Sequence, residues 1–341
     1  MKINRQELLN ILTLVKPALA KKDLTPQTTH FMFTGTEVAT YNGKICIMHP
    51  FETDFTFTVK GEEFFKLLSG VTEEEVELTQ EAEQIRLKSK KTSAGMACFV
   101  VSDHLGNGIL KMKDTMPAGP WKKLPYDFLR GVHFSMFTAA KDLTKGEYVS
   151  VHFNDKLIET ADGDSRASNF TMQSEFPDTL IAVQDIVELV KLPVTQYHLP
   201  PTAQMIHFIT PDYVTFSCMR RTGKYLPTDK YFDITGQPLT LPLELQGAVR
   251  SVVFLSEGEV EMEKKINVEI KDGTISCSAK NETGWVVKEV PIDYKGQTLS
   301  FQINPIFFAE MLEKSTNATI AEDRILFSTD NSRCILSLWR K

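Results

Sequence analysis

Six stretches of the chain carry apolar residues at helical spacing, and each is followed by shorter runs that alternate apolar and polar residues. NRQELLNILTLVKPAL is the first stretch and NPIFFAEMLEKS is the last. Apolar residues three and four positions apart predict amphipathic helices, whereas strict alternation predicts strands with one buried face. The predicted helices start 57 to 64 residues apart, at Asn4, Gly61, Pro125, Val183, Pro242 and Asn304. A period of this size is typical of a repeated supersecondary unit.

Each repeat consists of one helix followed by about four strands. The first helix is followed by HFMFTG, EVATYN, GKICIMHP and DFTFTVK, and the fifth by KINVEIK, GTISCSAK, WVVKEVPI and TLSFQI. Glycine-containing sequences such as YNGK, KDGT and YKGQ separate the runs as hairpin turns do. Two connectors rich in proline and glycine, residues 114–125 and 233–242, interrupt the pattern. We therefore predict an α+β fold of three similar domains, residues 1–118, 119–238 and 239–341, each a duplicated helix-plus-four-strand unit.

Composition places the chain among ordinary globular proteins. Hydrophobic residues make up 42% and charged residues 24% of its 341 residues, and no apolar run approaches the ~20 residues of a membrane span. The first residues are too polar for a secretory signal, so we expect a cytoplasmic protein without membrane contact. The five cysteines form no CxxC pair and lie in apolar or alternating runs, which predicts buried thiols.

The stretch ETADGDSRASNF, residues 159–170, brings three carboxylates and several hydroxyls together around one glycine. It either holds a metal ion or forms a tight turn between two strands. It lacks the alternating ligands and the distant glutamate of an EF-hand loop, and the histidines of the chain form no HExxH motif. GNG at residues 106–108 is an isolated GxG without a helical pattern after it, so it does not indicate nucleotide binding. We expect no cofactor and no metal; the alternative is a metal-dependent nucleic-acid hydrolase that uses the acidic turn at 159–165.

Six segments, in this order along the whole chain, resemble the bacterial-type DNA polymerase sliding clamp, the β subunit of the replicative polymerase. They are MKINRQELLNILTLV, GEEFFKLLSGVTEEEVEL, LRGVHFSMF, DIVELVKL, RRTGKYLPTDKYF and QINPIFFAEMLE. The resemblance implies the DNA clamp fold, with sheets outside and helices lining a ring that two chains close head to tail. It implies a non-catalytic processivity factor that encircles double-stranded DNA and binds the replicative polymerase and the clamp loader. A β-rich interaction module without DNA is a third reading.

A clamp needs basic side chains on the helices that face the DNA. The net charge of −6 argues against binding DNA by bulk charge, but a local basic surface can still face phosphates. Acidic runs such as TEEEVEL and EGEVEMEK on outer strands would repel misplaced DNA. The alternative for each basic residue is an ordinary solvated side chain. The candidates for the DNA channel are Lys16, Lys21, Lys22, Arg130, Lys141, Lys191 and Arg250.

The family also implies a partner-peptide pocket and a subunit contact. In the family a hairpin beside the pocket reads Thr-Asp-Gly-His-Arg-Leu-Ala; here, in residues 161–167, one more residue separates the glycine from the arginine, and the histidine is absent. The tail is matched by position only, and Trp339 could instead pack over the last sheet. The matching pocket positions are Gly163, Arg166, Phe232, Ile234, Asn304, Phe307, Leu338, Trp339 and Arg340. For the contact, VVFLSE matches a family stretch, which implies Phe254 and Leu255 opposite a strand with Met96, Cys98 and Phe99, unless these two end a core helix.

The chain departs from the family at its last residues, which read SLWRK where an apolar Met-Pro-Met-Arg-Leu-like tail is usual. The ring contacts lie elsewhere, so this change concerns partner choice. A diverged clamp encoded by a bacteriophage, acting in the host cytoplasm with its own polymerase, is compatible with these departures.

Overall fold

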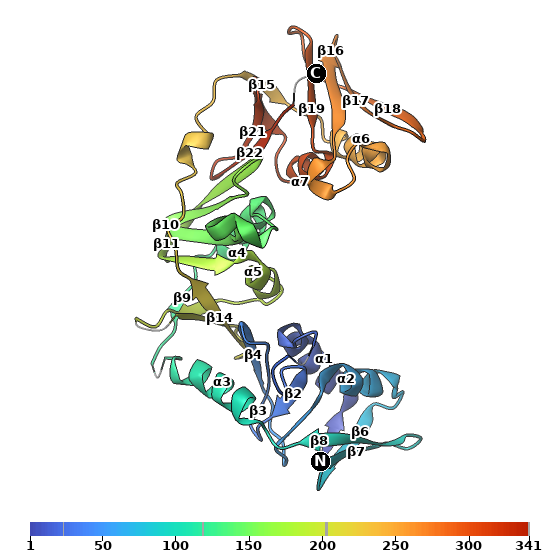
Figure 1. Cartoon of the computed structure of the whole chain (residues 1–341), viewed down its shortest axis with the longest axis vertical. Coiled ribbons are helices and arrows are strands. Elements are labelled where there is room, and N and C mark those ends of the chain that lie inside the picture. Colours follow the sequence, from blue (N-terminus) through green and yellow to red (C-terminus); the bar gives the residue numbers. More distant parts are fainter. Residues whose placement is uncertain (23, 118, 202–203, 340–341) are drawn as a thin grey trace. The chain divides into compact units, whose positions relative to one another are not determined.

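The computed structural model describes residues 1–22, 24–117, 119–201 and 204–339, which fold as two compact units. Unit 1 comprises Met1–Tyr126 and Gln184–Arg221, and unit 2 comprises Asp127–Val183 and Thr222–Lys341. Both units are mixed α and β, as the sequence predicts (Figure 1). Each unit combines segments of neighbouring predicted domains, because antiparallel strand pairs join them. The division into three domains, residues 1–118, 119–238 and 239–341, remains a prediction, because the two compact units do not test it.

Unit 1 is built on antiparallel sheets. Strand pairing follows the order β5-β2-β3-β4-β14-β13-β12-β9, and β8 extends from β5 to β7, β6 and β1. The elements are β1 (Lys2–Asn4), α1 (Arg5–Val15), η1 (Lys16–Ala18), β2 (His30–Phe33), β3 (Glu37–Tyr41), β4 (Ile45–Pro50), β5 (Phe57–Lys60), α2 (Gly61–Gly70), β6 (Glu75–Glu81), β7 (Gln84–Lys88), β8 (Ser93–Phe99), α3 (Asp103–Asp114), β9 (Lys122–Lys123), α5 (Val183–Leu189), β12 (Gln196–His198), β13 (Met205–Ile209) and β14 (Thr215–Arg221).

Unit 2 contains two antiparallel sheets, one ordered β10-β11-β22-β21-β20-β15 and the other β18-β17-β16-β19. The elements are α4 (Phe128–Ser135), η2 (Met136–Thr138), η3 (Leu143–Val149), β10 (Ser150–Ala161), β11 (Arg166–Ala182), η4 (Asp229–Tyr231), β15 (Gln237–Thr240), α6 (Leu245–Val252), η5 (Val253–Leu255), η6 (Glu261–Glu263), β16 (Ile266–Lys271), β17 (Thr274–Asn281), β18 (Gly284–Pro291), β19 (Leu299–Ile303), α7 (Pro305–Lys314), β20 (Asn317–Ile320), β21 (Arg324–Ser328) and β22 (Ser332–Ser337).

The six predicted helices are confirmed, and local chemistry explains where two of them begin. Asn4 precedes α1, and its side chain accepts a hydrogen bond from the amide of Glu7 at 3.0 Å. Asn304 precedes α7 and accepts hydrogen bonds from the amides of Ile306 and Phe307. Each asparagine satisfies amides that have no partner inside the first helical turn, which stabilises that end of the helix.

A further helix, α3, covers the GNG sequence, so the expectation of no helical pattern there was wrong. Three residues at helical spacing, Leu105, Ile109 and Met112, are buried against side chains of β2, β3 and β4. Ala39 of β3 packs on this α3 side, whereas the hydroxyl of Thr40 donates to the carbonyl of Val15 in α1. Neighbouring residues of a strand point to opposite faces, so the sheet is covered by α1 on one face and α3 on the other (Figure 1).

A glycine in α3 permits this packing. A Cβ atom on Gly108 would lie 2.5 Å from the Cε1 atom of Tyr41, closer than carbon atoms approach without displacement. Two glycines in three residues weaken the helical propensity of this stretch. Contact with the sheet outweighs that propensity.

Other sequence expectations also hold. The five cysteines are buried free thiols. Asp272 and Gly273 in the KDGT turn both have positive φ, as a two-residue Asp-Gly hairpin turn requires. Among the residues that the structure describes, no helix is long and apolar enough to cross a membrane.

Candidate functional site

The acidic stretch at 159–165 contains a tight turn built around one carboxylate. Oδ1 of Asp162 accepts hydrogen bonds from the backbone amides of Asp164, Ser165 and Arg166 at 3.0, 2.8 and 3.1 Å. The hydroxyl of Ser165 donates to Oδ2 of Asp162 at 2.7 Å. Gly163 has a φ of +84°, a conformation that favours glycine. The carboxylate of Asp162 therefore satisfies the backbone amides of the turn that joins β10 to β11 and stabilises that turn.

The other two carboxylates of the stretch point to different partners. Glu159 is buried and bonds with His152 and Thr228, and Asp164 pairs with Lys145. Within the described residues, no three histidine, cysteine, aspartate or glutamate side chains lie close enough together to hold a metal ion. The part of the chain that the structure describes therefore contains no set of metal ligands for the alternative reading, a metal-dependent hydrolase.

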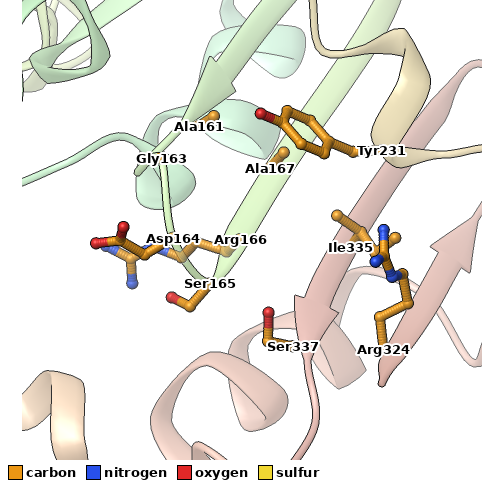
Figure 2. Close-up of a pocket in the computed structure, with 10 residues that line it drawn as sticks. All are labelled: Ala161, Gly163, Asp164, Ser165, Arg166, Ala167, Tyr231, Arg324, Ile335 and Ser337. Carbon is orange, nitrogen blue, oxygen red and sulfur yellow. The ribbon is translucent and has the colours of Figure 1, made fainter. Parts of the chain in front are cut away.

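A pocket of about 140 Å³ lies next to this turn. Figure 2 shows Ala161 and Ala167 on the hairpin beside the ring of Tyr231, with Ile335 and Arg324 on the adjoining strands β22 and β21. A cavity of ~150 Å³ holds a benzene-sized group, so this pocket has room for one medium-sized apolar side chain. Its remaining lining consists of Gly163, Asp164, Ser165, Arg166 and Ser337.

The apolar side of the pocket is formed by a small cluster around two alanines. Ala161 and Ala167 are opposite each other in the β10–β11 register, and Ile335 pairs with Ala167 across β11 and β22. Phe232 is buried against these three residues, and Ile234 packs beside it. The short alanine side chains leave an opening that larger residues would fill, and β-branched Ile335 and the ring of Tyr231 add apolar surface to it.

Arg166 supports the turn from inside the protein. Its side chain is fully buried, its Nη2 donates to the carbonyl of Ala139 at 3.2 Å, and its Nε lies 3.3 Å from Oδ2 of Asp162. The guanidinium carbon is 3.8 Å from the ring centroid of Phe307 on α7. Burial lowers the pKa of Arg166 from the ordinary arginine value, and the nearby Asp162 opposes that change. Arg166 therefore links the turn to α7.

The structure brings only part of the expected pocket set to this cavity. Gly163 and Arg166 line it, whereas Asn304 caps α7 and donates from Nδ2 to the carbonyl of Glu261. Leu338 is buried, and its amide donates to the carbonyl of Asp323.

Trp339 is placed elsewhere. Its main chain pairs with that of Gln302 on β19, and Nζ of Lys265 lies 4.7 Å from the centroid of its ring. Arg340 lies outside the described residues. Ser337, two residues before Trp339, lines the pocket, and neither Leu338 nor Trp339 does.

Sequence reasoning missed several residues that line the pocket. Ala161, Ala167, Tyr231, Arg324, Ile335 and Ser337 were not among the candidates. Ala161 and Ala167 flank the turn at 162–165 that the sequence predicted, so their position next to that turn could have identified them. Arg324 and Ile335 reach the pocket through pairing between strands far apart in the sequence, and no local pattern reveals such pairing.

Most of the predicted DNA-channel residues are paired with carboxylates. The pairs are Lys16–Glu62, Arg130–Asp127, Lys141–Glu261, Lys191–Glu188 and Arg250–Glu313, with nitrogen–oxygen distances of 2.7 to 3.8 Å. Lys21 and Lys22 are exposed. The pairing lowers the positive potential that these side chains present, so the basic surface is weaker than the sequence alone suggests.

The residues expected at a subunit contact differ in exposure. Phe254 on η5 is 71% exposed and Phe99 on β8 is 47% exposed, and Met96 is half-buried. Leu255 and Cys98 are buried within the chain, at 8% and 2% exposure. Phe254, Phe99 and Met96 therefore present apolar surface outside the core, whereas the other two belong to the protein's own core.

Comparison with known proteins rests on three-dimensional structure. No protein-family model matches the sequence, and no curated protein matches it. The β subunit of the DNA polymerase of Streptococcus pyogenes matches with a TM-score of 0.79 and 16% identity, covering 100% of this chain and 99% of its own. A DNA polymerase III β subunit from Thermotoga maritima matches with a TM-score of 0.77, 16% identity and the same coverage.

A sliding clamp from Pseudomonas aeruginosa, DNA polymerase III subunit β bound to griselimycin, matches with a TM-score of 0.78 and 15% identity, again over 100% of this chain and 99% of its own. At such identities the likeness concerns the fold, and it extends over the full length of both chains. The chain therefore has the DNA clamp fold of the bacterial DNA polymerase III β sliding clamps.

Proposed function

We propose that this chain is a DNA polymerase processivity factor, a sliding clamp that performs no chemistry of its own. The full-length likeness to the β sliding clamps carries this proposal. Two copies close head to tail into a ring around duplex DNA, and the ring tethers a polymerase and other replication proteins in the cytoplasm. Each copy contributes three domains, so six domains form the ring.

The ring contact is supported by the exposed apolar side chains of two short segments. Phe254 of one copy packs against the partner copy at the strand that holds Met96 and Phe99. An exposed edge strand is an aggregation hazard, and closing a ring covers it. A mass of twice 38.6 kDa in solution, measured by light scattering over a range of protein concentrations, is the expected result. A monomer at every concentration, with and without DNA, would contradict the ring.

Contacts to DNA are made by the basic side chains on or just after the helices. They reach phosphates and carry no sequence preference. Several of them must exchange a carboxylate partner for a phosphate, so each contact is weak. A closed ring holds DNA by its topology, and weak contacts then permit sliding.

The partner binds through the pocket beside the Asp162 turn. A short peptide places one apolar side chain against Ala161, Ala167, Ile335 and Tyr231, and its polar groups meet the rim. We expect a peptide selected on the immobilised protein from a random hexamer library to require this pocket. Tyr231→Ala should weaken binding of that peptide by about 2 kcal/mol, as loss of an aromatic contact does at many interfaces.

Trp339→Ala provides the comparison, because Trp339 was the first sequence candidate for the pocket. Fluorescence polarisation with the labelled peptide measures both variants, and light scattering checks that the ring is intact. An affinity loss in Tyr231→Ala with little change in Trp339→Ala supports this pocket. The reverse result would move the partner site to the tail of the chain.

A further inference from the structure

A strap, residues 224–234, crosses the face of the β10–β11 hairpin opposite to α4. Alternating residues of β10 show which face is which. The hydroxyl of Thr160 donates to the carbonyl of Ser135 in α4, so this residue faces the helix. Its neighbours Glu159 and Ala161 point the other way, toward the strap. Tyr231, which lines the pocket, and Phe232, which is buried against Ala161, both belong to the strap.

Glu159 holds the strap by its buried carboxylate, which is 3% exposed. Oε1 accepts hydrogen bonds from the hydroxyl and the amide of Thr228 at 2.6 and 3.2 Å, and Oε2 lies 2.9 Å from Nδ1 of His152. Burial by itself would raise the pKa of Glu159, but the hydrogen bonds from His152 and Thr228 outweigh it and lower that pKa. The ionised carboxylate is therefore the form that fits these three donors.

His152 extends the contact to a second carboxylate. Its Nε2 lies 3.3 Å from Oδ1 of Asp178, and its ring stacks on that of Tyr225 in the strap, with centroids 5.0 Å apart. The titratable groups placed against it are thus Glu159 on β10, Asp178 on β11 and Tyr225 on the strap. A neutral imidazole donates from one nitrogen, whereas the protonated ring donates from both. A proton on Nδ1 therefore satisfies Glu159, and a proton on Nε2 satisfies Asp178.

The position of Thr228 connects this contact to the pocket. Thr228 is the residue before η4, and its carbonyl accepts a hydrogen bond from the amide of Tyr231 at 2.9 Å. A shift of Thr228 therefore shifts η4, the short helix whose last residue, Tyr231, lines the pocket. Neither Glu159 nor His152 lines the pocket itself.

We propose that Glu159 and His152 are positioning residues that hold the strap, so that partner-peptide affinity depends on this contact. This inference rests on the proposed function, because it concerns the pocket through which the clamp recruits its partner. Its consequence is an affinity set by residues that do not touch the peptide.

The experiment measures the affinity of the selected hexamer peptide by fluorescence polarisation. Glu159→Ala should lower affinity on the order of tenfold, because the amide and hydroxyl of Thr228 lose a charged acceptor. Glu159→Gln keeps an acceptor for Thr228, so its affinity should lie between that of Glu159→Ala and that of the unmodified protein.

This partial rescue by Glu159→Gln is the readout that a general loss of stability would not produce. His152→Gln removes the ring that bonds Glu159 and stacks on Tyr225, so it should lower affinity severalfold. Glu175→Ala removes an exposed carboxylate from β11 and is the matched control, with the affinity of the unmodified protein.

Hydrogen exchange of residues 224–234 tests the strap without any peptide. We expect faster exchange there in Glu159→Ala and His152→Gln, with thermal midpoints otherwise close to that of the unmodified protein. Unchanged exchange in both variants, or a peptide affinity that Glu159→Ala leaves unchanged, would overturn the proposal. Faster exchange of the strap combined with peptide binding that ignores Tyr231→Ala would instead overturn the proposed pocket and leave the strap contact standing.

Discussion

Phe254 is the residue whose replacement tests the subunit contact most sharply. It is 71% exposed in the single chain, although it follows directly on a helix whose buried residues include Val249 and Val252. An aromatic side chain covers about 150–250 Å² when buried, so roughly 100–180 Å² of Phe254 remains available to a partner. At about 25 cal/mol per Å², covering that area stabilises each contact by roughly 3 kcal/mol.

Phe254→Ala should therefore raise the dissociation constant of each contact about a hundredfold. Sedimentation velocity from nanomolar to micromolar concentration measures the midpoint between one and two copies. Leu255→Ala is the matched control, because Leu255 is 8% exposed and its loss should lower thermal stability while leaving that midpoint in place. The reasoning fails if Phe254→Ala associates at the same concentrations as the unmodified protein, or if Leu255→Ala is the variant that dissociates.

Three further outcomes follow from the structure. Burial lowers the pKa of His207 to about 4, below the 6.5 of an ordinary histidine, so the unfolded chain binds more protons than the folded chain between these two pH values. The free energy of unfolding should therefore fall by about 3 kcal/mol as the pH drops from 6.5 to 4. His207→Asn should flatten this pH profile in thermal unfolding. Gly108→Ala should destabilise the protein by about 1–3 kcal/mol through the clash with Tyr41, and adding Tyr41→Leu should recover part of that loss in the same assay. Reversing the charge of several channel residues should shorten residence on DNA, most clearly at low salt, with only a small loss in thermal midpoint because exposed ion pairs contribute little to stability. Unchanged residence would remove them from the channel. The residues are Lys21, Lys22, Lys141, Lys191 and Arg250.

The repeat of helices and strands was readable because local chemistry marks it. Asparagine residues stand before α1 and α7, and alternation marks strands such as β16 and β17. The helix α3 could not be predicted from the sequence, because two glycines lower its helical propensity. The reason for Gly108 is the ring of Tyr41 beside it, and this contact joins residues that are far apart in the sequence.

The pocket shows the same division between local and distant information. The turn at Asp162 and Gly163 was identified because its residues are typical of tight turns. The pairing of Ala167 with Ile335 places β22 beside that turn, and no pattern within either strand specifies the partner or the register. Trp339 was proposed from its position near the end of the chain, but pairing with Gln302 directs it to β19.

Residence on closed and opened DNA distinguishes a ring from any protein that holds DNA by charge alone. The protein is loaded onto a nicked circular plasmid, separated from free protein by gel filtration at moderate salt, and then treated with a restriction enzyme that cuts the plasmid once. If the chain forms a sliding ring, it stays on the circle for minutes and leaves rapidly after the cut, because it slides off the new ends. Equal retention before and after the cut would contradict the clamp function, and so would immediate loss from the intact circle once a loader has acted.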